Sequence, residues 1–198
     1  DVWGRQIEVI NALGLTNGVT YDGEGRPRVV RTGLGACITN MYDCEGRLVS
    51  KVDSAGNQIS NTYAAVGNRI LETIAIGKCP ACSSIDTRPP LKIGYAYDAA
   101  NRLICKNEGS GRADARSYRF DYDALDRPVM ETDPMSNRLV RQYNPDGLQT
   151  NVVLYDETGN IVFRSSHEYD KRRLPVSEVG VAGEGRFYRK TIDYNAQG

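Results

Sequence analysis

Two cysteines three positions apart, Cys79 and Cys82, form the sharpest chemical motif of the chain. A Cys-x-x-Cys pair is half of a zinc site or a redox dithiol, because both use two thiolates at short spacing. Cys37, Cys44 and Cys105 stand singly, so the spacing supplies no further zinc ligands. The alternatives are a disulfide that closes a loop or two free thiols, and Cys79 and Cys82 remain weak candidate metal ligands. With five cysteines, at least one is unpaired within the chain, and the redox compartment stays open.

The single histidine, His167, lies between Ser166 and Glu168. Adjacent residues of a strand point to opposite faces, so these three side chains cannot form a catalytic triad among themselves. We expect His167 to pack on a strand or to face solvent. The glycine pairs at 109–111 and 183–185 do not lead into a helix, which disfavours a phosphate-binding loop. The sequence therefore predicts no catalytic residue, no cofactor and no enzyme.

The aspartates belong to a repeat. Tyr21, Tyr42 and Tyr63 are 21 residues apart. Two glycine series keep the same step: Gly4, Gly25, Gly46 and Gly67, and, about half a period away, Gly14, Gly35, Gly56 and Gly77. A period of this size is typical of a repeat architecture.

Each repeat carries a Tyr-Asp-x-x-Gly-Arg motif or a variant of it. The residues that define it are Tyr21, Asp22 and Gly25; Tyr42, Asp43, Gly46 and Arg47; Tyr97 and Asp98; Tyr122 and Asp123; and Tyr155, Asp156 and Gly159. Asn and Asp replace the glycine in later copies, and all three residue types tolerate positive φ, which predicts a left-handed turn residue there. The Asp can accept hydrogen bonds from the turn amides. Arg173 stands at the glycine position of the copy at Tyr169, where we expect a distorted turn.

Between the turns, apolar and polar residues alternate with period two, as in Tyr118, Phe120 and Tyr122, which is the strand-and-hairpin signal. The sequence predicts an all-β fold of about sixteen to eighteen short antiparallel strands, two per repeat, in a curved, spiralling sheet. A parallel β-helix is the alternative. Residues 1–198 read as one continuous repeat segment of a longer chain, with an inserted loop at 78–94 and smaller irregular insertions at 107–117 and 174–185.

The repeated Tyr-Asp motifs resemble those of the RHS/YD-repeat proteins, which include bacterial polymorphic toxins, insecticidal toxin complexes and animal teneurins. The resemblance covers essentially the whole chain. It implies a hollow β-sheet shell that often holds a C-terminal toxin domain. The segment Asn144-Pro145-Asp146-Gly147-Leu148 is similar to the sites at which such shells cleave themselves, but it begins with Asn and no second copy follows closely, so no catalytic residue is carried over.

The resemblance implies a structural function: a shell segment that encapsulates and helps deliver a C-terminal toxin or effector against competing bacteria or a host. Its partners would be the flanking repeats of its own chain, the enclosed toxin, and secretion-system or toxin-complex proteins, and its location would be secreted or at the cell surface. The alternative is a cell-surface adhesion or carbohydrate-binding module. That module would expose its tyrosine rings, whereas in a shell we expect each ring to stack on the next repeat's tyrosine. Twenty-five basic and 25 acidic residues leave no electrostatic case for nucleic acid, and no segment suggests membrane insertion.

Overall fold

The chain is all-β. A computed structural model describes residues 1–77, 89–182 and 186–194, and in these it contains sixteen strands and no helix. The strands of the first half are β1 (Glu8–Ile10), β2 (Thr16–Tyr21), β3 (Pro27–Arg31), β4 (Cys37–Tyr42), β5 (Leu48–Asp53), β6 (Gln58–Tyr63), β7 (Arg69–Ala75) and β8 (Leu91–Tyr97). Those of the second half are β9 (Leu103–Glu108), β10 (Arg116–Tyr122), β11 (Pro128–Thr132), β12 (Arg138–Tyr143), β13 (Gln149–Tyr155), β14 (Ile161–Tyr169), β15 (Pro175–Ala182) and β16 (Arg186–Thr191).

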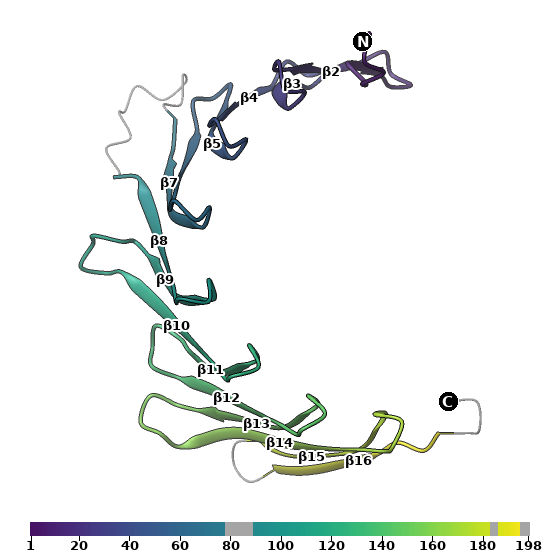
Figure 1. Cartoon of the computed structure of the whole chain (residues 1–198), viewed down its shortest axis with the longest axis vertical. Coiled ribbons are helices and arrows are strands. Elements are labelled where there is room, and N and C mark those ends of the chain that lie inside the picture. The colour runs from purple at the N-terminus through teal and green to yellow at the C-terminus, as the bar shows by residue number, and fades with distance from the viewer. Residues whose placement is uncertain (78–88, 183–185, 195–198) are drawn as a thin grey trace. The chain divides into compact units, whose positions relative to one another are not determined.

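Hydrogen-bonded neighbours follow the sequence order from β1 to β16, so each strand lies beside the one that precedes it (Figure 1). The pairings of β1 to β8 and of β10 to β16 are antiparallel. The predicted fold of tandem antiparallel hairpins is confirmed, and the parallel β-helix is wrong. The chain divides into two compact units, which we describe separately: unit 1 is Asp1–Tyr95 with Glu108–Ala115, and unit 2 is Ala96–Asn107 with Arg116–Gly198.

The five-residue turns share one backbone design. In the turn after β4, the amide of Gly46 donates to the carbonyl of Asp43, and the amide of Asp43 donates to the carbonyl of Arg47, both at 3.0 Å. Gly46 has a φ of 81°, in the left-handed region where glycine has no Cβ penalty. This is a three-residue hairpin loop closed by a left-handed residue. Turns at one end of the strands carry the Tyr-Asp motif, and we call them the Tyr-Asp turns. Those at the other end, such as Asp53 to Asn57, are the opposite turns.

The turn after Tyr169 corrects one expectation. Arg173 takes the left-handed conformation with φ 67°, and its amide donates to the Asp170 carbonyl at 2.9 Å, as in the glycine turns. The turn is therefore regular and not distorted. Asn101, Asp126 and Ser136 adopt the same conformation. Hydrogen bonds of the turn outweigh the steric cost of a Cβ at positive φ, which is small enough for a single residue to bear.

The steric cost of a Cβ at positive φ leads to a prediction for Ser136, which has a φ of 70°. Replacing Ser136 with glycine is expected to raise the free energy of unfolding by up to about 1 kcal/mol. Glycine removes the steric strain of the left-handed conformation. Part of this gain is offset because glycine loses more backbone entropy than serine on folding. Urea denaturation measures the change. The same replacement at Ser54, in an opposite turn of unit 1 and without a positive φ, should instead be neutral or destabilising. A Ser136→Gly variant less stable than the parent protein would contradict the prediction.

The three predicted insertions are shorter in the structure. Residues 91–94 of the predicted loop 78–94 belong to β8, and residues 78–88, including Cys79 and Cys82, lie outside the described residues. Of the range 107–117, only 109–115 connect β9 to β10. In the range 174–185, residues 175–182 form β15. Pro175 is compatible with this strand because it is the first residue, where the missing amide hydrogen is tolerated.

Among the described residues no hydrophobic side chain is fully buried, and the buried polar residues are Ser50, Ser165 and Ser177. A single-layer sheet cannot be stabilised by a hydrophobic core, so contacts between neighbouring strands must supply more of its stability. These contacts are uneven. Within the hairpin β4–β5 five residue pairs are in register, whereas between the hairpins, as in β5–β6, only three are. Backbone pairing between successive hairpins stops short of the Tyr-Asp turns, which leaves a gap for side chains to fill.

Candidate functional site

The Tyr-Asp turn is held together by its aspartate and arginine. The Asp43 carboxylate accepts the backbone amide of Arg47 at 2.8 Å through Oδ1 and its Nε at 2.7 Å through Oδ2. Both side chains are largely covered, at 28% exposure for Arg47 and 18% for Asp43. One carboxylate thus closes the turn through one oxygen and orients the guanidinium through the other. The planar guanidinium, with its fixed N–H directions, suits such an oriented contact.

The oriented guanidinium reaches the next repeat. Arg47 Cζ lies 4.8 Å from the centre of the Tyr63 ring, and Nη1 donates to the Ala64 carbonyl at 3.4 Å. In return, the Tyr63 hydroxyl donates to the Leu48 carbonyl at 2.8 Å, and Asn61 Nδ2 donates to the same oxygen at 3.0 Å. We call this set of contacts a clamp. It fills the gap where backbone pairing between β5 and β6 has stopped.

Clamps recur along each unit. The arginine lies over the next tyrosine for the pairs Arg5 and Tyr21, Arg26 and Tyr42, Arg47 and Tyr63, Arg102 and Tyr122, and Arg127 and Tyr143. The distances between the guanidinium carbon and the ring centre are 4.4, 4.7, 4.8, 5.0 and 4.7 Å in that order. The prediction that each tyrosine stacks on the next tyrosine is therefore wrong, because an arginine covers the ring and a cation over an aromatic face is favourable.

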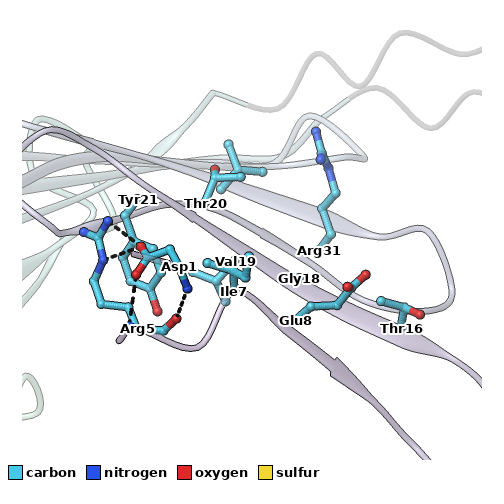
Figure 2. Close-up of a pocket in the computed structure, with 11 residues that line it drawn as sticks. Asp1, Arg5, Ile7, Glu8, Thr16, Gly18, Val19, Thr20, Tyr21 and Arg31 are labelled. Atoms are coloured by element: carbon cyan, nitrogen blue, oxygen red, sulfur yellow. Dashed lines mark hydrogen bonds and ion pairs between the residues drawn. The ribbon is translucent and has the colours of Figure 1, made fainter. Parts of the chain in front are cut away.

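The first clamp lies at the N-terminal end of unit 1 (Figure 2). Arg5 binds the Asp1 carboxylate through Nε at 2.7 Å and through Nη2 at 2.6 Å, and Figure 2 shows the guanidinium beside Tyr21. A cavity of about 570 Å³ borders it. Its other charged residues, Glu8 and Arg31, lie apart from the Asp1 and Arg5 pair in Figure 2. The cavity therefore does not bring an acid and a base together as a general acid–base site needs.

The turn aspartates are acidified by their hydrogen bonds. The Arg127 side chain, which donates to Asp123, lowers the pKa of that carboxyl against the opposing effect of desolvation. The Asn57 side chain lowers the pKa of Asp53 in the same way in an opposite turn. At Asp156 the Thr158 hydroxyl is the leading cause, and the pKa falls to about 2. These carboxylates stabilise the turns in their ionised form, and they do not have the raised pKa of a catalytic acid.

The lowered pKa values predict a one-sided pH dependence. A folded-state pKa below the unfolded value of about 3.9 gives a stabilisation that is complete above that value and is lost as the pH falls through the folded pKa. We expect the urea midpoint to be level from about pH 7 to 5 and to fall steadily below about pH 4. The Asp156→Asn variant should lose less stability on acidification than the parent protein, because its side chain no longer takes up a proton. A midpoint that rises below about pH 4 would overturn this account.

The other candidate groups are dispersed. His167 is half-buried, and its Nε2 lies 3.2 Å from the Ser165 hydroxyl, on the same face of β14. Its described hydrogen-bond partner is therefore Ser165, two residues away along the strand. In the part of the chain that the structure describes, no cluster of three His, Cys, Asp or Glu side chains is arranged to hold a metal. Cys37, Cys44 and Cys105 are free thiols, and a hydrogen bond to the Glu45 carboxylate raises the pKa of Cys44.

The predicted turn residues fall into two groups. The Tyr and Asp residues at 21–22, 42–43, 97–98 and 122–123 lie at Tyr-Asp turns, with Gly25, Gly46 and Arg47. Tyr155, Asp156 and Gly159 instead form an opposite turn, in which Asn160 takes the place of arginine and donates to Asp156 at 3.1 Å. The inter-repeat role of arginine was not predicted. The signal for it was present, because arginine recurs at 5, 26, 47, 102 and 127, directly after the left-handed residue of the turn.

No family model matches the sequence, and neither does any curated protein. Among solved structures, the chain is similar to one from the Photorhabdus luminescens Tc holotoxin pore, which contains a TccC3 variant, with a TM-score of 0.68 and 13% identity. The similarity covers 89% of this chain and 9% of that one. A crystal structure of TcdB2-TccC3-TEV matches over 98% of this chain and 13% of the other, at 14% identity and a TM-score of 0.42.

The chain thus spans about a tenth of the length of the toxin chain that it resembles. At 13% identity the likeness concerns the fold, and the fold agrees with the repeat meter, the hairpin turns and the Tyr-Asp motifs. The chain has the RHS/YD-repeat fold that its Tyr-Asp motifs predict, shared with a segment of a Tc toxin.

Proposed function

We propose that this chain is a structural segment of a repeat-sheet shell that encapsulates a C-terminal toxin or effector domain and helps deliver it. The observation that carries the proposal is the match to a Tc holotoxin pore chain over 89% of this chain. The rest of the protein, including any enclosed toxin, would lie in other parts of a longer chain. Its setting would be outside the cell that makes it, in competition with bacteria or in attack on a host.

The geometry suits a wall more than a binding module. Clamps join successive hairpins at five junctions of the two units, and the described side chains form a single layer without a buried hydrophobic core. Such a layer presents two faces, one for an interior and one for an exterior. The role needs no catalytic residue of this segment, since containment depends on the continuity of the sheet.

The experiment is limited proteolysis of the intact protein, followed by mass measurement and sequencing of the fragments. We expect a protease-resistant product that contains the strands β1 to β15, together with a separable C-terminal piece. A chain that is digested evenly, or one with no sequence beyond the repeats, would overturn encapsulation. Release of the C-terminal piece only after the repeat fragment is denatured would further support containment.

The alternative, a carbohydrate-binding adhesion module, requires exposed aromatic faces. The rings of Tyr21, Tyr42, Tyr63, Tyr122 and Tyr143 are half-buried, and each has a guanidinium over it. The ring face that a guanidinium covers is not open to a sugar, so these tyrosines favour the structural role. Specific glycan binding that is lost on replacing clamp tyrosines would support the alternative instead.

A secreted or cell-surface location belongs to the same proposal. Within the described ranges, no helix has the length and apolar character needed to cross a membrane. The partners that we propose are the flanking repeats, the enclosed toxin and other proteins of a toxin complex or secretion system. Fractionation of the producing culture, with detection of this chain in the medium or on the cell surface, tests the location.

A further inference from the structure

The clamps of unit 2 are not all complete. Two successive hairpins meet beside each Tyr-Asp turn, and we call each such place a junction. At the junction of β11 and β12, Arg127 lies over Tyr143 at 4.7 Å and its Nη1 donates to the Asn144 carbonyl at 3.3 Å. The Tyr143 hydroxyl donates to the Pro128 carbonyl at 2.9 Å. Three side-chain contacts therefore span this junction.

The next junction, between β13 and β14, has five backbone pairs in register against three between β11 and β12, but it lacks the arginine clamp. Leu148 stands where the other turn has Arg127, and the Asn144 side chain accepts its amide at 2.9 Å, as Asp123 accepts that of Arg127 at 3.0 Å. Leucine has no group to donate to the following turn. Among the described residues, no cation lies over the Tyr169 ring.

The additional backbone pairs of β13 and β14 lie away from the Tyr-Asp turn, and beside the turn the pairing stops at the same place as between β11 and β12. The register between β11 and β12 ends at Met130 and Val140, and that between β13 and β14 ends at Asn151 and Ser166. Each junction is therefore left with unpaired strand ends next to its Tyr-Asp turn. At the β13–β14 junction the described contacts are the bond from the Tyr169 hydroxyl to the Gln149 carbonyl, at 2.7 Å, and one ion pair.

That ion pair is a weak substitute for a clamp. Arg173 Nη2 lies 3.5 Å from Asp146 Oδ1, and both side chains are 63% exposed. Exposed pairs at this distance are screened by water and salt and contribute little. The guanidinium stack, the bond from Nη1 and the aspartate that orients them are all lacking.

We propose that the junction of Leu148 and Tyr169 is a hinge, the place in unit 2 where neighbouring hairpins open from each other most readily. The opening is confined to the ends of β13 and β14 beside the Tyr-Asp turns, because the five residue pairs from Asn151 to Tyr155 hold the other ends together. The Tyr169 hydroxyl bond is the contact that breaks. This inference concerns the sheet itself and stands apart from the proposed encapsulation.

Hydrogen exchange on the intact protein tests the hinge with two opposite changes. The Asn144→Asp and Leu148→Arg double variant builds the missing clamp, and exchange at 149–151 and 166–169 should slow by about fivefold or more, the size of a cation–π contact and one hydrogen bond. The Arg127→Leu variant removes a clamp, and exchange at 129–130 and 141–143 should speed up by a similar factor. In that variant the segment 149–169 should be unchanged.

The two variants keep the proposal falsifiable. If the double variant folds and exchange at 149–151 is not slowed, the missing arginine does not create the hinge. If the double variant fails to fold, Arg127→Leu decides the matter alone: unchanged exchange at 141–143 would mean that a clamp does not restrain a junction. Equal exchange at the two junctions of the parent protein, after correction for the intrinsic rate of each amide, would also overturn the hinge.

Discussion

Replacing Tyr143 with alanine is expected to lower the free energy of unfolding of unit 2 by about 2 to 3 kcal/mol. The ring is half-buried, stacks under Arg127 at 4.7 Å and donates to the Pro128 carbonyl at 2.9 Å. Truncation removes apolar contact, one hydrogen bond and a cation–π contact at a junction where backbone pairing has stopped. The value lies at the lower end for aromatic truncations, because the ring is not fully buried. Urea denaturation, followed by circular dichroism, measures it.

Two further variants separate the ring from its hydroxyl. Tyr143→Phe keeps the stack and loses only the bond to Pro128, so we expect a loss of about 1 kcal/mol. Tyr155→Phe is the matched control, because Tyr155 has Arg138 at 5.3 Å and no hydrogen bond of its hydroxyl is found among the described residues. It should be near neutral. If Tyr143→Ala is no more destabilising than Tyr155→Phe, the clamps do not hold the hairpins together.

Replacing Gly33 with alanine is expected to cost about 1 to 3 kcal/mol in unit 1. A Cβ at Gly33 would lie 2.6 Å from Leu15 Cβ and 3.0 Å from the Leu15 carbonyl carbon, so the turn after β3 would have to move from the neighbouring turn. That movement also strains the bond from the Gly33 amide to Asn17 Oδ1, which is 3.0 Å long. The turn after β3 therefore approaches the turn after β1 this closely because Gly33 has no side chain.

Gly23 is the matched control for Gly33. It holds the same place in a Tyr-Asp turn, where an added Cβ would meet nothing within 4 Å. Gly23→Ala should be neutral or stabilising by up to about 1 kcal/mol, because alanine restricts the unfolded chain. Thermal unfolding of the two variants, side by side with the parent protein, measures the difference. Equal effects would mean that the close approach at Gly33 is relieved without cost.

Local features were predictable because they depend on few neighbouring residues. The 21-residue step, the period-two alternation and the Asp-x-x-Gly turns predict hairpins, and the structure confirms them. The exception at Arg173 arose because positive φ was treated as a property of residue type. The turn's hydrogen bonds, which any residue's backbone can make, decide the conformation there. The strand β15 also differs from the irregular insertion predicted at 174–185, because a proline is tolerated at the first position of a strand, where Pro175 lies.

What the sequence by itself determined is the repeat, the turn chemistry and the order of strands, since each rests on contacts within about twenty residues. What only the tertiary structure decided is how one repeat holds the next. Arg47 and Tyr63 are 16 residues apart, and nothing in their spacing says that a guanidinium, and not a second ring, covers the tyrosine. That choice follows from the carboxylate of Asp43, which fixes the guanidinium where the strands diverge, and from the Leu48 carbonyl that this divergence leaves for the Tyr63 hydroxyl.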